Sequence, residues 1–395
     1  MFNNYSHTIR ASYIAYMTHA AINNFAPLLF LTFQNSYSIN IERIAMLVGI
    51  NFGVQLTVDL LAAKYADMIG YKPLIVASQI FAALGLVGLG TLPELLPDAY
   101  LGLLVSVVLY GMGGGIMEVL ISPIVEACPT EKKSASMSLL HSFYCWGHVA
   151  VILVSTGFFV VFGIENWRIL ACMWAIMPAL NAFYFSRTPI AMLNQHGESM
   201  GIKALVSTKL FWLLMLLMIC SGASEQAMVQ WASFFAESGL NISKTLGDLA
   251  GPGVFAALMG VVRVLYSKFS EKINLKKFIA GSGCLCIVTY LTASLSASPL
   301  IGLIACALCG LSVGIMWPGI LSIAAEKCPR GGTALFALLA LGGDVGCSGG
   351  PTLVGFVSGA LEGGIKAGIA AGVVFPVLLV LGLIPLFFLQ KNNRV

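Results

Sequence analysis

Long apolar segments separated by short polar ones run along the whole chain. Each apolar segment has about 20 residues or more, the length that a helix needs to cross a hydrocarbon core of about 30 Å. We therefore predict an all-α membrane protein with twelve transmembrane helices. The predicted spans are residues 9–34, 43–63, 73–93, 99–125, 135–162, 167–186, 210–236, 247–267, 277–296, 298–325, 332–360 and 367–389.

The composition supports a membrane protein and excludes several classes of soluble protein. The chain has 395 residues, of which 58% are hydrophobic and 10% charged, whereas about 25% of the residues in soluble proteins are charged. No phosphate-binding GxxxxGK[ST] loop or zinc-ligand spacing occurs, and no soluble domain is large enough for an enzyme site. We expect no enzyme and no nucleic-acid binding. The ten cysteines lie mostly in apolar segments, where packing explains them.

The basic residues predict the orientation in the membrane, since cytoplasmic loops are enriched in Lys and Arg. With both termini and the polar segment 187–209 in the cytoplasm, sixteen basic residues lie inside and four outside. The opposite orientation would invert this ratio. We therefore expect a multi-pass protein of the cytoplasmic membrane with both termini cytoplasmic.

The two halves of the chain resemble each other. Gly115-Ile116-Met117 recurs as Gly314-Ile315-Met316, and residues 126–129 recur as residues 326–329, at an offset of 199 to 200. Parallel repeats of membrane helices are typical of transporters with a central site between the halves. We predict a six-helix bundle at residues 1–186, a cytoplasmic linker at 187–209, and a second six-helix bundle at 210–395.

Twelve spans, parallel repeats and a basic central loop resemble the major facilitator superfamily over the whole chain. The superfamily's loop motif between spans 2 and 3 survives in residues 63–72, where Asp67, Gly70 and Lys72 match, although the first Gly and the Arg after Asp67 do not. By this resemblance, Asp67 and Lys72 would act as gating residues on the cytoplasmic side. A solvated loop carboxylate is the alternative for Asp67.

Span 2 has a polar stripe at Asn51, Gln55 and Asp59, spaced i, i+4 and i+8 on one helix face. A polar stripe facing lipid would be unfavourable, so these residues are expected to line a cavity. A hydrogen-bonded seam between helices is the alternative. Arg263 is the repeat equivalent of Asp59, and an Asp59–Arg263 pair could form a gate; an Arg whose side chain extends to the membrane interface is the alternative. A double-mutant cycle on transport rate, with independent effects of the two substitutions, would contradict this pairing.

Glu118 in span 4 follows a glycine-rich run and precedes Pro123. This stretch resembles span 4 of the fucose-permease branch of the superfamily, in which a Glu serves proton coupling. The resemblance makes Glu118 the first candidate for the proton site; a structural Glu bonded to backbone is the alternative. That branch also uses an Asp in span 1, where this chain has only Asn23 and Asn24.

Span 7 has Glu225 at mid-membrane, with Gln226 and Gln230 on a second polar face and Trp231 beside it. Carboxylates and amides bond to hydroxyls, and an indole covers the apolar side of a sugar ring. These residues, with Asn23 and Asn24 of span 1 and Asn51 and Gln55 of span 2, are predicted to bind substrate. Hydrogen bonding between helices is the alternative.

The remaining candidates lie in spans 5, 10 and 11. Asp344 is a candidate second coupling acid, along with Asp59; the alternative for Asp344 is packing against span 2. In span 5, His141, Tyr144 and His148 share one helix face, and Trp146 lies nearby. These side chains are candidates for a proton relay or for substrate contact. Trp317 could stack on a ligand or belong to the core.

These features predict a secondary active transporter, working by alternating access, that imports a sugar or similar polyhydroxylated metabolite together with protons. The alternatives are an exporter or antiporter of amphipathic compounds, an ion-independent uniporter, and a sensor that binds without transporting. No cofactor is expected beyond the coupling ion, a proton or Na⁺. The expected partners are a small molecule and the lipid bilayer, and a monomer is expected.

Overall fold

The computed structural model describes residues 4–129, 133–190, 202–269, 273–328 and 332–388, and within these ranges the regular structure is entirely helical. Helices occupy all twelve predicted spans. Ten segments of the described chain are long and apolar enough to cross a membrane. The two predicted spans outside these ten contain α1 and α16, which are rich in polar residues and glycine, respectively. The prediction of an all-α membrane fold is confirmed.

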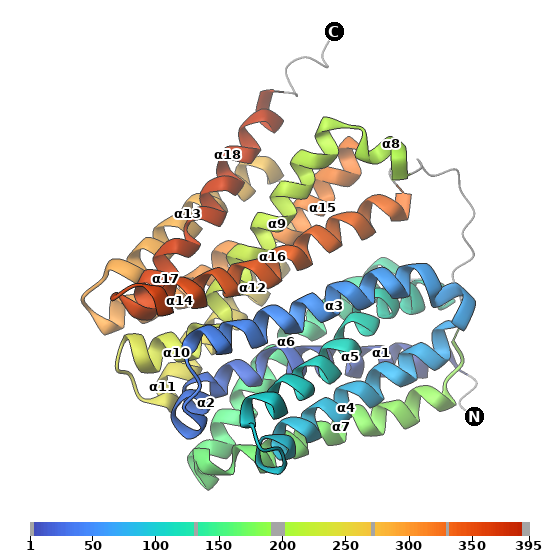
Figure 1. Ribbon diagram of the computed structural model, residues 1–395. Helices are drawn as coiled ribbons and strands as arrows, with labels where there is room; N and C mark the ends of the chain where they lie inside the picture. The colour runs from blue at the N-terminus through green and yellow to red at the C-terminus, as the bar shows by residue number, and fades with distance from the viewer. Residues whose placement is uncertain (1–3, 130–132, 191–201, 270–272, 329–331, 389–395) are drawn as a thin grey trace. The chain divides into compact units, whose positions relative to one another are not determined.

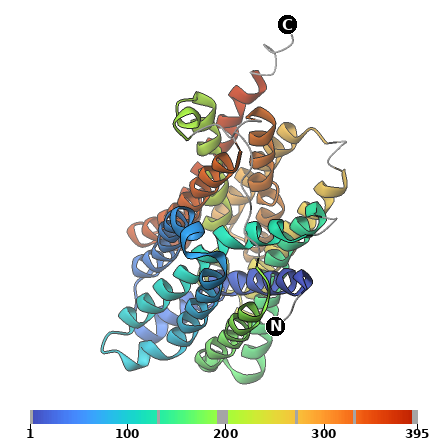
Figure 2. The same cartoon turned by 90° about the vertical axis from the view of Figure 1, so that its right-hand side faces the viewer.

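The first half of the chain forms α1 through α7, which lie side by side in one unit (Figures 1 and 2). Three short 3₁₀ or α segments interrupt the series, at residues 26–29, 30–37 and 164–166. The unit comprises residues 1–39 and 50–195. Its main helices are α1 (Tyr5–Asn24), α3 (Ile41–Ile69), α4 (Tyr71–Leu95), α5 (Ala99–Ala127), α6 (Lys133–Phe162) and α7 (Trp167–Arg187), with the short α2 at Phe30–Tyr37.

The second unit comprises residues 40–49 and 196–395, so the first turns of α3 are grouped with it. Two π-helical segments, Phe235–Gly239 and Leu249–Gly253, flank α11. Its helices are α8 (Ile202–Val206), α9 (Lys209–Val229), α10 (Ala232–Phe234), α11 (Lys244–Asp248), α12 (Val254–Phe269), α13 (Leu275–Leu295), α14 (Pro299–Val313), α15 (Met316–Lys327), α16 (Gly332–Ala360), α17 (Gly364–Gly372) and α18 (Val374–Phe388).

Local chemistry sets several helix ends. The side chains of Asp98, Thr208 and Asn274 accept hydrogen bonds from backbone N–H groups in the first turns of α5, α9 and α13. Gly70, between α3 and α4, has φ of +92°, a conformation that side chains other than glycine disfavour. The loop-motif glycine is therefore explained by the sharp turn that joins these two helices.

Two of the predicted spans are interrupted at corresponding places in the two halves. In span 1, α1 ends at Asn24 and a 3₁₀ turn follows at Ala26–Leu29. In span 7, α9 ends at Val229 and α10 begins at Ala232. Interrupted membrane helices in corresponding positions of two repeats are typical of the substrate region of transporters. The polar residues described below lie next to these interruptions.

The packing of α16 on α9 gives a prediction about stability. A Cβ added at Gly346 would collide with the backbone O of Ile219 and N of Ala223, whereas a Cβ at Gly349 meets no atom within 4 Å. Gly346→Ala is expected to destabilise the protein by about 1–3 kcal/mol, the usual cost of overpacking. Gly349→Ala, three residues away on the same helix, should be neutral or slightly stabilising. Thermal unfolding in detergent measures both, and equal melting temperatures would contradict this account of the packing.

Candidate functional site

A buried set of three amides, here called the amide cluster, joins α1 to α3 in the first unit. Gln55 Nε2 donates to Asn23 Oδ1 at 2.9 Å and to Asn51 Oδ1 at 3.1 Å. Asn51 Nδ2 also donates to Asn23 Oδ1, at 3.1 Å. All three side chains belong to residues only 4–5% exposed. The amide groups therefore satisfy one another away from water and lipid.

The glycines of α5 explain how a polar stripe is accommodated here. A Cβ at Gly114 would come within 2.9 Å of the Gln55 side chain, and one at Gly115 within 3.0 Å of Asp59 Oδ1. The glycines thus let α5 lie directly on the stripe of α3. The favoured expectation of an open cavity wall is corrected for Asn51 and Gln55, which form a hydrogen-bonded seam with α1. Asp59 is also buried, next to Gly115 of α5.

His19 extends the amide cluster towards α5, and the sequence analysis did not select it. Its Nε2 lies 3.2 Å from Gln55 Oε1 and 3.5 Å from Glu118 Oε2. The side chain of His19 is 5% exposed, whereas that of Glu118 is 37% exposed. Tyr16, His19 and Asn23 are spaced i, i+3 and i+7 in span 1, a helical spacing that could have identified His19.

An aromatic group from α1 and α6 surrounds this imidazole. The ring of His19 meets that of Tyr144 at 5.5 Å and that of Tyr16 at 6.4 Å, both edge to face. Tyr16 also meets the exposed His141, at 5.4 Å, and its hydroxyl lies 3.3 Å from Ser122 Oγ. Asn24 Nδ2 donates to Tyr144 Oη at 3.5 Å. The structure thus brings four predicted site residues, Asn24, Glu118, His141 and Tyr144, around the unpredicted pair Tyr16 and His19.

The second unit has its own charged pair at membrane depth. Arg263 Nη2 lies 3.7 Å from Glu225 Oε2, and Arg263 Nε donates to the backbone O of Gly314 at 3.0 Å. Gly314 directly follows the end of α14, so the guanidinium satisfies a carbonyl at a helix interruption. Gln226 Nε2 donates to Glu225 Oε1 at 3.4 Å, and Gln230 Nε2 to Gln226 Oε1 at 3.0 Å.

The predicted tryptophans differ in their surroundings. Trp231 is fully buried and its indole N–H donates to the backbone O of Pro351 at 2.9 Å, so its ring packs inside the second unit. The ring of Trp317 lies against Gly343, where a Cβ would collide with it. Asp344, the next residue, is also buried. Trp146 on α6 is 52% exposed.

The gating candidates are only partly described. Lys72 Nζ donates to the backbone O of Thr188 at 3.0 Å, which ties the start of α4 to the end of α7. The side chain of Asp67 lies outside the described residues. Because Arg263 pairs with Glu225 in its own unit, the Asp59–Arg263 gate stays a prediction.

A second buried ionic group, also absent from the sequence predictions, follows the interruption of span 7. Lys244 Nζ lies 3.1 Å from both Glu237 Oε1 and Asp248 Oδ2, and Ser233 Oγ donates to Asp248 Oδ1. Burial raises the pKa of Glu237, and the nearby Lys244 ammonium offsets part of that rise. These contacts join α10, α11 and the π-helical segment Phe235–Gly239.

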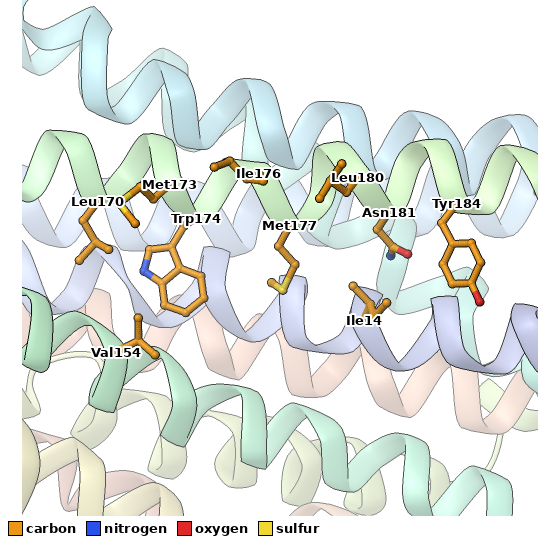
Figure 3. A pocket seen from close by; sticks show the side chains of 10 residues that line it. All are labelled: Ile14, Val154, Leu170, Met173, Trp174, Ile176, Met177, Leu180, Asn181 and Tyr184. Carbon is orange, nitrogen blue, oxygen red and sulfur yellow. The ribbon is translucent and has the colours of Figure 1, made fainter.

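A groove of about 680 Å³ lies between α1, α6 and α7, and it contains none of the predicted site residues (Figure 3). Polar groups of its lining residues bond to other parts of the unit: Asn181 Nδ2 to the backbone O of Ala11 and to Gln79 Oε1, Tyr184 Oη to His7 Nδ1, and Trp174 Nε1 to Ser155 Oγ. Ile176 and Leu180 in its wall are more than half exposed. An apolar groove with exposed walls fits lipid better than a hydrophilic substrate.

The family model described as Major Facilitator Superfamily matches residues 12–351. The chain belongs to this superfamily. The membrane protein MosC of Rhizobium meliloti is 24% identical to the chain over 334 residues, which cover 83% of this chain and 78% of MosC. The protein is therefore a multi-pass membrane protein of a transporter superfamily, and the predicted resemblance is confirmed.

Two solved structures show how widely this fold is shared. A bacterial homologue of the human lysosomal transporter Spinster matches with a TM-score of 0.75 at 14% identity, covering 98% of this chain and 97% of its own. The fucose:proton symporter of E. coli matches with a TM-score of 0.64 at 16% identity, covering 96% and 98%. At these identities the likeness shows the fold alone.

Proposed function

We propose that this superfamily member is a proton-coupled symporter that imports a sugar or a similar polyhydroxylated metabolite. The observation that supports this most is the setting of Glu118. Its side chain is 37% exposed at membrane depth, while its neighbour His19 and the amide cluster behind it are buried. An ionisable residue in a membrane span usually serves a proton or substrate pathway.

Glu118 has what a coupling group needs. It is accessible enough to exchange a proton, and it has a histidine partner at 3.5 Å that can respond to its charge. Among the described residues, no hydrogen bond from Glu118 to a backbone group supports the alternative of a structural Glu. Span 1 has no carboxylate to match the second acid of the fucose-permease branch, and its polar groups on this face are His19, Asn23 and Asn24.

The groups near Glu118 favour a hydroxylated substrate. His141 is exposed, Tyr144 and Asn24 lie beside it, and Tyr16 is packed beneath. Imidazoles, phenols and amides donate and accept hydrogen bonds, and their rings can cover the apolar side of a sugar. The fold is shared with a fucose:proton symporter, which agrees with this choice. It is shared as well with a homologue of the lysosomal transporter Spinster, so the exporter of amphipathic compounds stays the main rival.

In the proposed cycle the bundles 1–186 and 210–395 move against each other and expose the site to each side of the membrane in turn. Both termini and the linker 187–209 lie in the cytoplasm, as the basic residues indicate. Asp67 and Lys72 act on the cytoplasmic side, and Glu225 with Gln226 and Gln230 supplies substrate contacts from the second half. Asp59 and Asp344 are the next candidates for the proton-binding group.

Purified protein in liposomes containing a pH-sensitive dye tests the proposed function. A panel of sugars is added outside, with and without a sodium gradient. Internal acidification that requires both the protein and one sugar is the expected result. Sugar uptake without acidification would replace the symporter by a uniporter or, if it follows sodium, by a sodium symporter. No response to any sugar would overturn the sugar assignment and favour the exporter of amphipathic compounds.

A further inference from the structure

The hydrogen bonds of Gln55 fix the role of the His19 ring. Both hydrogens of Gln55 Nε2 are used, one by Asn23 Oδ1 and one by Asn51 Oδ1. The atom that Gln55 turns towards His19 is therefore its carbonyl Oε1. Since a carbonyl oxygen only accepts, His19 Nε2 must hold a hydrogen and donate it.

His19 Nε2 has its hydrogen-bond partner on one helix and a carboxylate neighbour on another. Gln55 Oε1, on α3, lies 3.2 Å from His19 Nε2, and Glu118 Oε2, on α5, lies 3.5 Å from it. A carboxylate is a stronger acceptor than an amide, whereas a protonated carboxyl group is a weaker one. How strongly the His19 N–H bonds to Gln55 Oε1 therefore depends on whether Glu118 is ionised.

We propose that His19 is a positioning residue that transmits the protonation state of Glu118 to the amide cluster. With Glu118 ionised, the His19 N–H is drawn towards α5. When Glu118 takes a proton, His19 donates to Gln55 alone, and α1 is held to α3 through Gln55, Asn23 and Asn51. Because Asn23 precedes the interruption of span 1, the charge of Glu118 reaches the helix end where substrate binding is proposed. The inference rests on the proposed function in assigning the proton to Glu118.

The surroundings of His19 leave Glu118 as its main charged neighbour among the described residues. From α6 it faces Tyr144, with His141 and the buried His148 further along that helix; from α1 itself it faces Tyr16. From α3, Gln55 is neutral and Asp59 lies one turn further along, against Gly115. Gln79 of α4 and Asn181 of α7 are neutral. Asn181 donates to Gln79 and to the backbone O of Ala11 in α1.

The test follows the protonation of Glu118 itself by infrared difference spectroscopy on purified protein in lipid. The carboxyl C=O band that is absent in Glu118→Gln belongs to Glu118, and its intensity against pH gives a midpoint. His19→Leu removes the donor to the carboxylate, so the midpoint should rise by about one pH unit or more. Gln55→Leu removes the competing acceptor, so the midpoint should fall.

Opposite shifts in these two variants are the signature of a shared N–H group, because a merely structural defect would not reverse its sign. His19→Gln keeps an N–H donor and should lie closer to wild type than His19→Leu does. His7→Gln, whose ring bonds to Tyr184 at the far end of α1, is the matched control and should not shift. An unchanged midpoint in His19→Leu, or shifts of the same sign in His19→Leu and Gln55→Leu, would overturn the inference.

Transport measurements separate this inference from the proposed function. The KM for the active sugar is measured against pH in wild type and in Gln55→Leu. In each protein KM should change around a midpoint pH, and the midpoint of Gln55→Leu should lie below that of wild type, as in the infrared measurement. Wild type could move sugar and protons together while the infrared midpoint is unchanged in both His19→Leu and Gln55→Leu. That result would overturn only the role proposed for His19. A wild type that moves no proton with its substrate overturns the proposed function, and the inference with it.

Discussion

Glu118→Gln is expected to abolish proton-driven sugar accumulation while leaving the exchange of sugar across the membrane intact. Glutamine resembles the protonated acid in shape and charge, so the loaded protein can still bind sugar and change conformation. It cannot release a proton, so the step that couples the gradient to accumulation is lost. Accumulation should fall to the level of empty liposomes, and counterflow of radiolabelled sugar should stay within about threefold of wild type, a difference of less than 1 kcal/mol.

Glu126→Gln is the matched control, since Glu126 lies on the same helix, two turns further on and close to its end. It should leave both accumulation and exchange unchanged. If Glu118→Gln loses exchange together with accumulation, Glu118 would be a substrate ligand or a structural residue. If it retains accumulation, the coupling group lies elsewhere, and Asp59 and Asp344 become the next candidates.

The sequence was sufficient for the fold because the relevant signal is simple. A span needs only a sufficient length of apolar side chains, and all twelve predicted spans contain helices. The repeat around Gly115 and Gly314 and the loop motif ending at Lys72 were also enough to indicate the superfamily. The interruptions of spans 1 and 7 were not predicted, since the polar residues beside them, Asn23 and Asn24 in span 1 and Gln226 and Gln230 in span 7, were interpreted as substrate contacts and not as helix breaks.

The site was harder to predict because a polar stripe has the same spacing whether it faces water or another helix. Asn51, Gln55 and Asp59 form such a stripe, and it is the glycine run of α5 that decides for a seam. His19 was overlooked because a single histidine in a polar helix has no sequence signal for its partner. Its contact with Glu118 depends on the rotation of α1 against α5, which the sequence pattern does not specify.

Arg263→Gln is expected to destabilise the protein by about 3 kcal/mol, the lower end of the cost of breaking a buried ion pair. The side chains of Arg263 and Glu225 are 28% and 12% exposed, so the loss should not reach the upper end of that range. The substitution leaves Glu225 without its cation and removes the Nε donor of the Gly314 carbonyl. Denaturant or thermal unfolding in detergent measures the loss, and Arg187→Gln, at an exposed helix end, should change stability by less than about 0.5 kcal/mol.

The double variant Glu225→Gln/Arg263→Gln decides what the pair contributes. If the cost of Arg263→Gln comes from leaving a carboxylate alone in the membrane, neutralising both residues should recover most of it, because two facing amides can bond to each other. If the double variant regains stability but not transport, the two charges are needed for substrate binding or for gating. If the double variant is as unstable as the sum of the single ones, the pair is not coupled, and the bond from Arg263 to Gly314 at the helix interruption is the interaction that matters.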